Sequence, residues 1–175
     1  MANEKDVSEK LLENYNDVFA DILNALLFDG REVVKAEELE NAVTVSQVKL
    51  LDGLHEQERD TAKYWKHGTI IIAAFGGENQ SRPDPAMPLR AVSYDGTFYK
   101  DQVNRYNSER KQGQPISPFY PAITVILYFG KTRWRGPKTL RECFQNLPAD
   151  LEPFIPDYPI HVIELAFLSP EQHRR

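Results

Sequence analysis

Residues 69–90 read TIIIAAFGGENQSRPDPAMPLR, and the character of this stretch changes halfway along. An apolar run ends at two glycines, after which Glu78, Asn79 and Gln80 lead into a loop with three prolines. The run indicates a core strand over 69–75, and because side chains alternate along a strand, Glu78 and Gln80 are expected to share a face at its end. A carboxylate held there suits Mg²⁺, which prefers one or two carboxylates together with water and phosphate oxygens.

The residues before this strand predict an antiparallel partner. Residues 59–65, RDTAKYW, are joined to it by Lys66, His67 and Gly68. A three-residue connection that ends in glycine is typical of a β-hairpin with a bulge. Asp60, on this partner strand, is therefore the expected second metal ligand.

The register of that hairpin leaves a gap between the two acids. With a three-residue turn Asp60 pairs with Ala74, which places it roughly 13 Å from Glu78 at ~3.3 Å per residue. A bulge at the two glycines, or a longer turn, has to close this gap. Otherwise Glu56, which this register sets opposite the strand end, or Glu58 is the second ligand.

Two segments have helical periodicity. The clearer helix covers residues 6–28 and ends at Asp29-Gly30, where glycine suits the left-handed residue after the last turn. A second helix covers residues 89–106, after a loop at 81–88, and its Gly96 suggests close packing. The buried face expected for the first helix consists of Val7, Leu11, Tyr15, Val18, Ile22 and Leu26. The face expected for the second consists of Val92, Gly96, Tyr99, Val103 and Tyr106.

Two nearly unbroken apolar runs, 122–129 and 160–168, predict interior strands covered on both faces. A short strand at 31–35, a helical turn at 35–41, a turn at Asp52-Gly53 and a short helix at 137–144 complete the expected elements. The order of elements predicts an α/β fold in which helices flank a mixed β-sheet. A chain of 175 residues is expected to form one domain.

Charge is distributed unevenly along the chain. The net charge is −5, but residues 1–60 carry −9 and residues 61–175 carry +4. This asymmetry favours an anionic partner on one side, and solvated faces of both signs are the alternative. No apolar run is long enough to span a membrane, and the charged N-terminus is not of signal-peptide type, so a cytoplasmic protein without membrane contact is expected. The single Cys143 cannot form an internal disulfide.

A basic run with an embedded aromatic follows the strand at 122–129. Such a run suits contact with a nucleic-acid backbone, and a solvated surface turn is the alternative. Arg90 and Tyr94 lie one helical turn apart and are expected to face the cleft, where Arg90 contacts a phosphate or forms a surface salt bridge. The four histidines lack zinc-ligand spacing. The basic run consists of Lys131, Arg133, Trp134, Arg135 and Lys138.

The spacing of Asp60 and the E-x-Q at 78–80 resembles the core of the PD-(D/E)xK nuclease superfamily. That superfamily places an acid on the second strand, E-x-K on the third, and another acid on the first helix. Longer phrases resemble one of its families, the recombination-promoting nuclease (Rpn) and putative transposase family. These phrases are NYNDVFADILNALLFDG, LHEQERDTAKYWKHG, GGENQSRPDPAMPLRAVSYDG, ITVILYFG and HVIELAFLS.

The resemblance implies a restriction-endonuclease-like core and a Mg²⁺- or Mn²⁺-dependent DNA endonuclease linked to recombination or mobile elements. It implies that Asp60 and Glu78 hold the metal and that Gln80 stands at the catalytic lysine position. Asp17 matches the first-helix acid, with Glu13 and Asp21 as alternatives. A double-strand cutter needs two active sites, so a symmetric homodimer is expected.

Three departures from the family pattern limit what the resemblance implies. Gln80 cannot supply the positive charge of a lysine, no proline precedes Asp60, and the chain ends seven residues after Leu168, as expected of a truncated member. The substitution at Gln80, the early end and the acidic net charge favour the alternative, a catalytically silent relative that binds DNA or protein.

Overall fold

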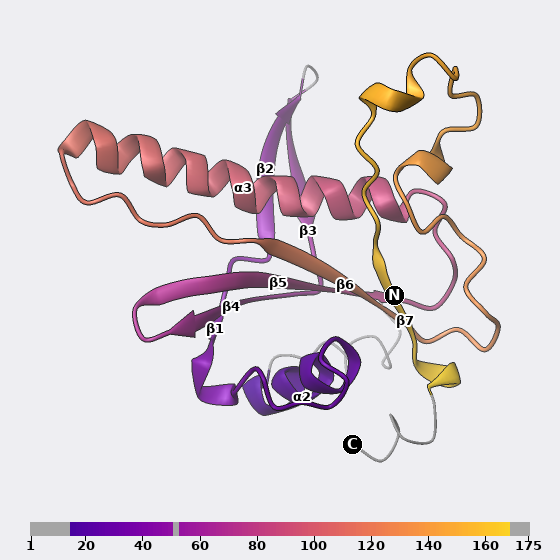
Figure 1. Cartoon of the computed structure of the whole chain (residues 1–175), viewed down its shortest axis with the longest axis horizontal. Coiled ribbons are helices and arrows are strands. Elements are labelled where there is room, and N and C mark those ends of the chain that lie inside the picture. The colour runs from indigo at the N-terminus through magenta and orange to yellow at the C-terminus, as the bar shows by residue number, and fades with distance from the viewer. Residues whose placement is uncertain (1–14, 51–52, 169–175) are drawn as a thin grey trace.

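The computed structural model describes residues 15–50 and 53–168. Its main feature is a mixed five-stranded sheet in the order β1-β4-β5-β6-β7 (Figure 1). The pairs β1–β4 and β4–β5 are antiparallel, whereas the pairs β5–β6 and β6–β7 are parallel. The strands are β1 (Leu39–Asn41), β4 (Thr61–His67), β5 (Ile70–Gln80), β6 (Ala122–Tyr128) and β7 (His161–Glu164). A separate two-stranded antiparallel sheet pairs β2 (Val45–Leu50) with β3 (Gly53–Glu58).

Two helices, α2 (Asn16–Leu26) and α3 (Met87–Gln112), cover opposite faces of the larger sheet (Figure 1). Phe75, on one face of β5, belongs to the apolar cluster that contains Leu23 of α2. Ala74, on the other face, packs with Phe98 of α3. The predicted mixed sheet flanked by helices is therefore confirmed, and even-numbered positions at this end of β5 face α3. None of the described helices is long and apolar enough to cross a bilayer.

The predicted hairpin is confirmed, but its register differs from the expected one. His67 pairs with Ile70, so the turn contains two residues, Gly68 and Thr69, rather than three. Gly68 has φ +61°, the left-handed conformation that glycine adopts at no steric cost. The expected bulge at the two glycines is wrong, because the ladder is regular there; the irregularity lies between Trp65 and Lys66.

These two changes shift the register by four residues, which is the size of the expected gap. Thr61 pairs with Gly77, so the preceding residue, Asp60, lies opposite Glu78. Glu56 pairs with Gln47 of β2 in the smaller sheet and does not lie opposite this strand end. The hairpin alone therefore brings the two acids to the same end of the sheet.

The buried face of α2 matches the predicted one only in part, because Ile22 and Leu26 of the predicted stripe pack against the core. Phe19 and Leu23 are buried, whereas Tyr15 of the predicted stripe is 57% exposed; Val7 and Leu11 lie outside the described residues. Asn24 is also buried, and its Oδ1 accepts hydrogen bonds from the backbone of residues 33 and 34. This explains why the strand expected at 31–35 does not form. The helix ends at Leu26, two residues earlier than predicted, and the predicted left-handed turn follows it at Asp29 and Gly30, which both have positive φ.

Helix α3 is longer than predicted and presents a different face to the sheet. Pro88 lies in its first turn, where a missing N–H costs nothing, and the helix continues to Gln112. The predicted face is wrong, because Tyr99 and Val103 are 44% and 50% exposed. The buried residues are Met87, Pro88, Ala91, Tyr94, Asp95, Phe98 and Gln102.

Of the two predicted interior strands, only β6 is interior. The β7 strand has four residues and ends the sheet within the described part of the chain. The run therefore owes its apolar character partly to the 3₁₀ turn Leu165–Phe167, which follows directly. The helix expected at 137–144 reduces to the 3₁₀ turn Arg141–Cys143; the others are Ala36–Glu38 and Glu152–Phe154.

Two glycines of α3 provide a matched test of its helical geometry. Gly96 is exposed, and no atom lies within 4 Å of the position that an added methyl group would take, so the expected close packing is absent. We expect Gly96→Ala to raise the free energy of unfolding by roughly 0.5–1 kcal/mol. Gly113→Ala should lower it by about 1 kcal/mol, because Gly113 ends the helix at φ +65°. Urea denaturation of both variants measures these changes in the free energy of unfolding. Changes of the same sign in the two variants would contradict the expectation.

Candidate active site

The first of the two glycines before Glu78 has a packing reason. A Cβ atom on Gly76 would lie 2.6 Å from Nη1 of Arg59 and 3.2 Å from Oγ1 of Thr124. Arg59 is 3% exposed, so its guanidinium has little room to move away. Glycine at 76 therefore leaves room for a buried arginine between β5 and α3, two residues before Glu78.

Glu78 is a buried carboxylate with one oxygen paired and one oxygen unpaired. Its side chain is 3% exposed, and Oε2 accepts a hydrogen bond from Nη2 of Arg90 at 2.8 Å. Among the described residues, none makes a hydrogen bond to Oε1. Burial raises the pKa of Glu78 from 4.5 to about 7; Arg90 opposes this rise and the neighbouring charge of Asp60 adds to it.

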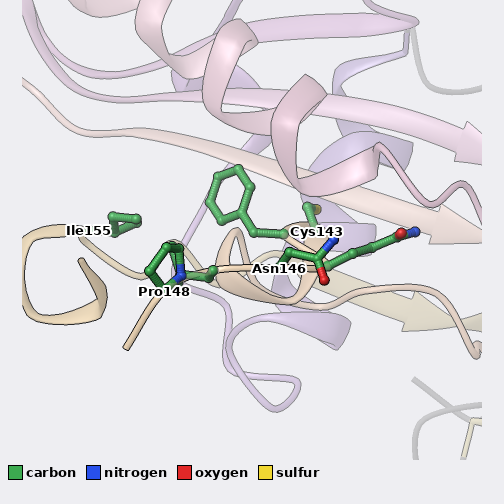
Figure 2. A pocket seen from close by; sticks show the side chains of 7 residues that line it. Cys143, Asn146, Pro148 and Ile155 are labelled. Carbon is green, nitrogen blue, oxygen red and sulfur yellow. The ribbon is translucent and has the colours of Figure 1, made fainter. Parts of the chain in front are cut away.

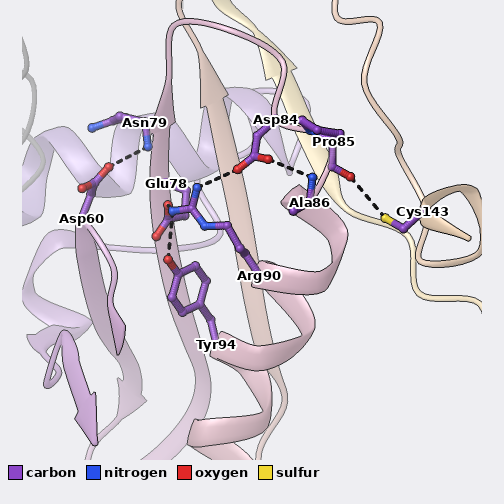
Figure 3. Close-up of polar contacts among 9 residues, drawn as sticks. All are labelled: Asp60, Glu78, Asn79, Asp84, Pro85, Ala86, Arg90, Tyr94 and Cys143. Atoms are coloured by element: carbon purple, nitrogen blue, oxygen red, sulfur yellow. Dashed lines mark hydrogen bonds and ion pairs between the residues drawn. The ribbon is translucent and has the colours of Figure 1, made fainter. Parts of the chain in front are cut away.

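Arg90 lies between two carboxylates (Figure 3). Its Nη1 donates to Asp84 at 3.0 Å, and its Nη2 donates to the Tyr94 hydroxyl at 3.0 Å as well as to Glu78. Burial alone would lower the pKa of Arg90, but the hydrogen bonds and the charge of Glu78 outweigh it and the pKa is raised. Asp84 also accepts from the backbone N–H of Ala86 at 2.8 Å, which fixes the loop at the start of α3.

Asp60 and Gln80 complete this end of the sheet. Asp60 accepts a hydrogen bond from the backbone N–H of Asn79 at 2.9 Å, which ties it to β5 (Figure 3). Gln80 is half-buried on the same face of β5 as Glu78, and its backbone carbonyl accepts from Phe129 at 2.8 Å. The structure therefore places Asp60, Glu78 and Gln80 at one end of the β4–β5 hairpin, with Arg90 paired to Glu78.

A buried polar network beneath the site was not predicted. The guanidinium of Arg59 lies 4.3 Å from the ring centroid of Phe98 and donates to the backbone carbonyl of Tyr94. Asp95, 2% exposed, accepts hydrogen bonds from Thr124 Oγ1 at 2.6 Å and from the Tyr158 hydroxyl. Burial lowers the pKa of Arg59, and Asp95 is the larger of the two carboxylate charges that oppose this. The only sequence signal was a charged residue, Asp95, within the span of an amphipathic helix.

The acid expected from the first helix does not join the site. Asp17 and Asp21 are exposed on α2, which covers the opposite face of the sheet from α3 and Glu78. Glu13 lies outside the described residues. The sequence suggested a metal-binding acid on this helix but did not show which face of the sheet the helix covers.

The donors present are few but of the right chemistry for a hard cation. Among the described residues, no three His, Cys, Asp or Glu side chains are grouped to hold a metal ion. Mg²⁺ needs only one or two carboxylates when water and phosphate oxygens supply the rest. Glu78, with an unpaired buried oxygen, and Asp60 opposite it fit that requirement.

The basic run divides into exposed and buried members. Lys131, Arg133 and Arg135 are exposed, although Arg133 pairs with Glu164 at 3.3 Å. Trp134 is 6% exposed and stacks edge-on against Tyr128 with centroids 5.2 Å apart, so its ring belongs to the core and offers no face to a base. Lys138, expected with them, is exposed as well.

Two hollows lie away from this site. One, of about 370 Å³, is lined by the loop residues 143–148 and Ile155 (Figure 2). The other, of about 480 Å³, is lined by residues 37–40, Lys66, Gly68 and Thr69. Cys143, at the rim of the first, donates a weak hydrogen bond to the carbonyl of Pro85 at 3.6 Å, which links this loop to the start of α3 (Figure 3).

In comparisons with known proteins, the chain matches no family model, no curated protein and no solved structure. The function proposed below is therefore based on its own residues and their arrangement.

Proposed function

We propose that this protein is a Mg²⁺- or Mn²⁺-dependent DNA endonuclease with a restriction-endonuclease-like core, linked to recombination or mobile elements. The observation that carries the proposal is the position of Glu78. It is a buried carboxylate with an unpaired oxygen on β5, and Asp60, directly before β4, lies opposite it. In chain order β4 and β5 are the second and third strands of the five-stranded sheet, because the β2–β3 hairpin between β1 and β4 forms a separate sheet. The PD-(D/E)xK superfamily places its metal-binding acids on the same two strands.

The residues have distinct expected roles. Glu78 and Asp60 would hold the cation, with its other positions left to water and phosphate oxygens. When bound, the ion supplies an activated water and neutralises charge on the scissile phosphate. Gln80, on the Glu78 face of β5, would orient that water through its amide but adds no charge. Lys131 and Arg135, both exposed, would contact the DNA backbone.

Two features favour the second candidate, a catalytically silent relative that binds DNA or protein. Gln80 stands where a lysine would supply charge, and Arg90 already neutralises Glu78. Both candidates keep the fold, and they differ in whether divalent cations bind and support cleavage.

Cleavage of a supercoiled plasmid distinguishes them. We expect nicking or linearisation with millimolar Mg²⁺ or Mn²⁺ and none with a chelator, because the activated water depends on the ion. Cleavage by Asp60→Asn should fall to the level of the chelated control. Asp101→Asn, a substitution at an exposed residue of α3, should cleave like the wild type.

Metal-dependent cleavage that persists in Asp60→Asn would show that Asp60 is not a required metal ligand. Plasmid binding without any metal-dependent cleavage in the wild type would favour the silent relative.

A further inference from the structure

Arg90 is paired with the Glu78 carboxylate, which a cation would need as a ligand. Its Nη2 lies 2.8 Å from Oε2 of Glu78. The two partners differ in exposure, because the side chain of Arg90 is 37% exposed and that of Glu78 only 3%. A ligand arriving from solvent therefore meets the arginine first.

Arg90 has a second anchor that does not involve Glu78. Its Nη1 pairs with Asp84 at 3.0 Å, and Asp84 is fixed in turn by the N–H of Ala86. The guanidinium can thus turn away from Glu78 while it keeps one carboxylate partner. Its planar fork of donors also suits a phosphate, which it can bind through two parallel hydrogen bonds.

We propose that Arg90 is an exchangeable counter-ion: it holds Glu78 in the free protein and transfers to a DNA phosphate in the complex, which exposes Glu78 to the divalent cation. This inference rests on the proposed nuclease function and adds to it that substrate and cation bind cooperatively. Two positive groups on one carboxylate repel each other, so the Arg90 contact weakens cation binding until a phosphate removes it. The coupling is reciprocal: DNA raises cation affinity by the same factor as the cation raises DNA affinity.

The first test measures Mn²⁺ affinity by calorimetry without DNA. We expect Arg90→Gln to bind Mn²⁺ about tenfold more tightly than the wild type, since a hydrogen bond to a charged group contributes on the order of a factor of ten in affinity. Arg110→Gln, an exposed change near the end of the same helix, is the matched control and should bind like the wild type. Arg90→Lys keeps the charge without the fork and should fall between them, which gives a second variant if Arg90→Gln folds poorly.

The second test measures the affinity of a labelled duplex by fluorescence anisotropy, with and without Ca²⁺. Ca²⁺ takes the same oxygen ligands, and intact duplex is verified on a gel. The wild type should bind the duplex several-fold more tightly with Ca²⁺, and Arg90→Gln should bind it more weakly and lose this enhancement. Equal Mn²⁺ affinity in the wild type and both Arg90 variants overturns the counter-ion role and leaves the nuclease proposal standing. Absence of Mn²⁺ binding in every variant, and of any Ca²⁺ effect on the duplex, overturns both.

Discussion

Asp95→Ala is expected to lower the free energy of unfolding by about 3–5 kcal/mol, the range for removal of one partner from a buried charged network. Asp95 is 2% exposed and accepts hydrogen bonds from Thr124 and Tyr158. Its loss leaves both hydroxyls without their acceptor and leaves Arg59, 3% exposed, without its principal opposite charge. Guanidinium denaturation measures the effect.

Two companion variants separate charge from packing. Asp101→Ala, exposed on the same helix, should change stability by less than about 0.5 kcal/mol. Adding Arg59→Met to Asp95→Ala removes the stranded charge and should recover part of the loss. A double variant less stable than Asp95→Ala alone would show that Arg59 is stabilised by its ring contacts rather than by Asp95.

Local signals in the sequence predicted the sheet better than the helix faces. Glycine at 68 and the apolar run after it define the β4–β5 hairpin within a few residues, and the run at 122–129 defines β6. The predicted buried face of α3 was wrong because the helix buries Asp95 and Gln102 and exposes Tyr99 and Val103. Apolar periodicity assumes that polar side chains face water, and a helix that covers a polar site breaks that assumption.

The candidate site likewise contains residues that local sequence patterns can predict and residues that they cannot. Asp60, Glu78 and Gln80 lie at one end of a single hairpin, so motif spacing was enough to place them near one another, although the register of the turn differed from the expected one. The acid expected from the first helix lies on the other face of the sheet, which local spacing could not show. The network below them joins Asp95 to residues 29 and 63 positions further along the chain. No local pattern connects such partners, because the packing of α3 and of the loop before β7 brings them together.

Glu78→Gln is expected to remove the pH dependence that Glu78 imposes on stability. Burial raises the pKa of Glu78 to about 7 in the folded protein, against an ordinary 4.5. Between these values the folded state holds a proton that the unfolded state has released, so the contribution of Glu78 to stability falls as the pH rises. Above about pH 7 both states are ionised, and the accumulated penalty is about 3 kcal/mol.

The variant should therefore match the wild type at pH 4, where Glu78 is mostly protonated in both the folded and the unfolded state and resembles glutamine, and exceed it by about 3 kcal/mol at pH 8. Urea denaturation at the two pH values measures this, and Glu32→Gln, at an exposed glutamate, should show no such divergence. Millimolar Mn²⁺ at pH 8 should raise the melting temperature of the wild type, because a cation at Glu78 removes the penalty, and should leave Glu78→Gln unchanged. Parallel pH curves for wild type and variant would mean that the ion pair with Arg90 fully offsets the burial of this carboxylate. The penalty that a cation is expected to relieve would then not exist.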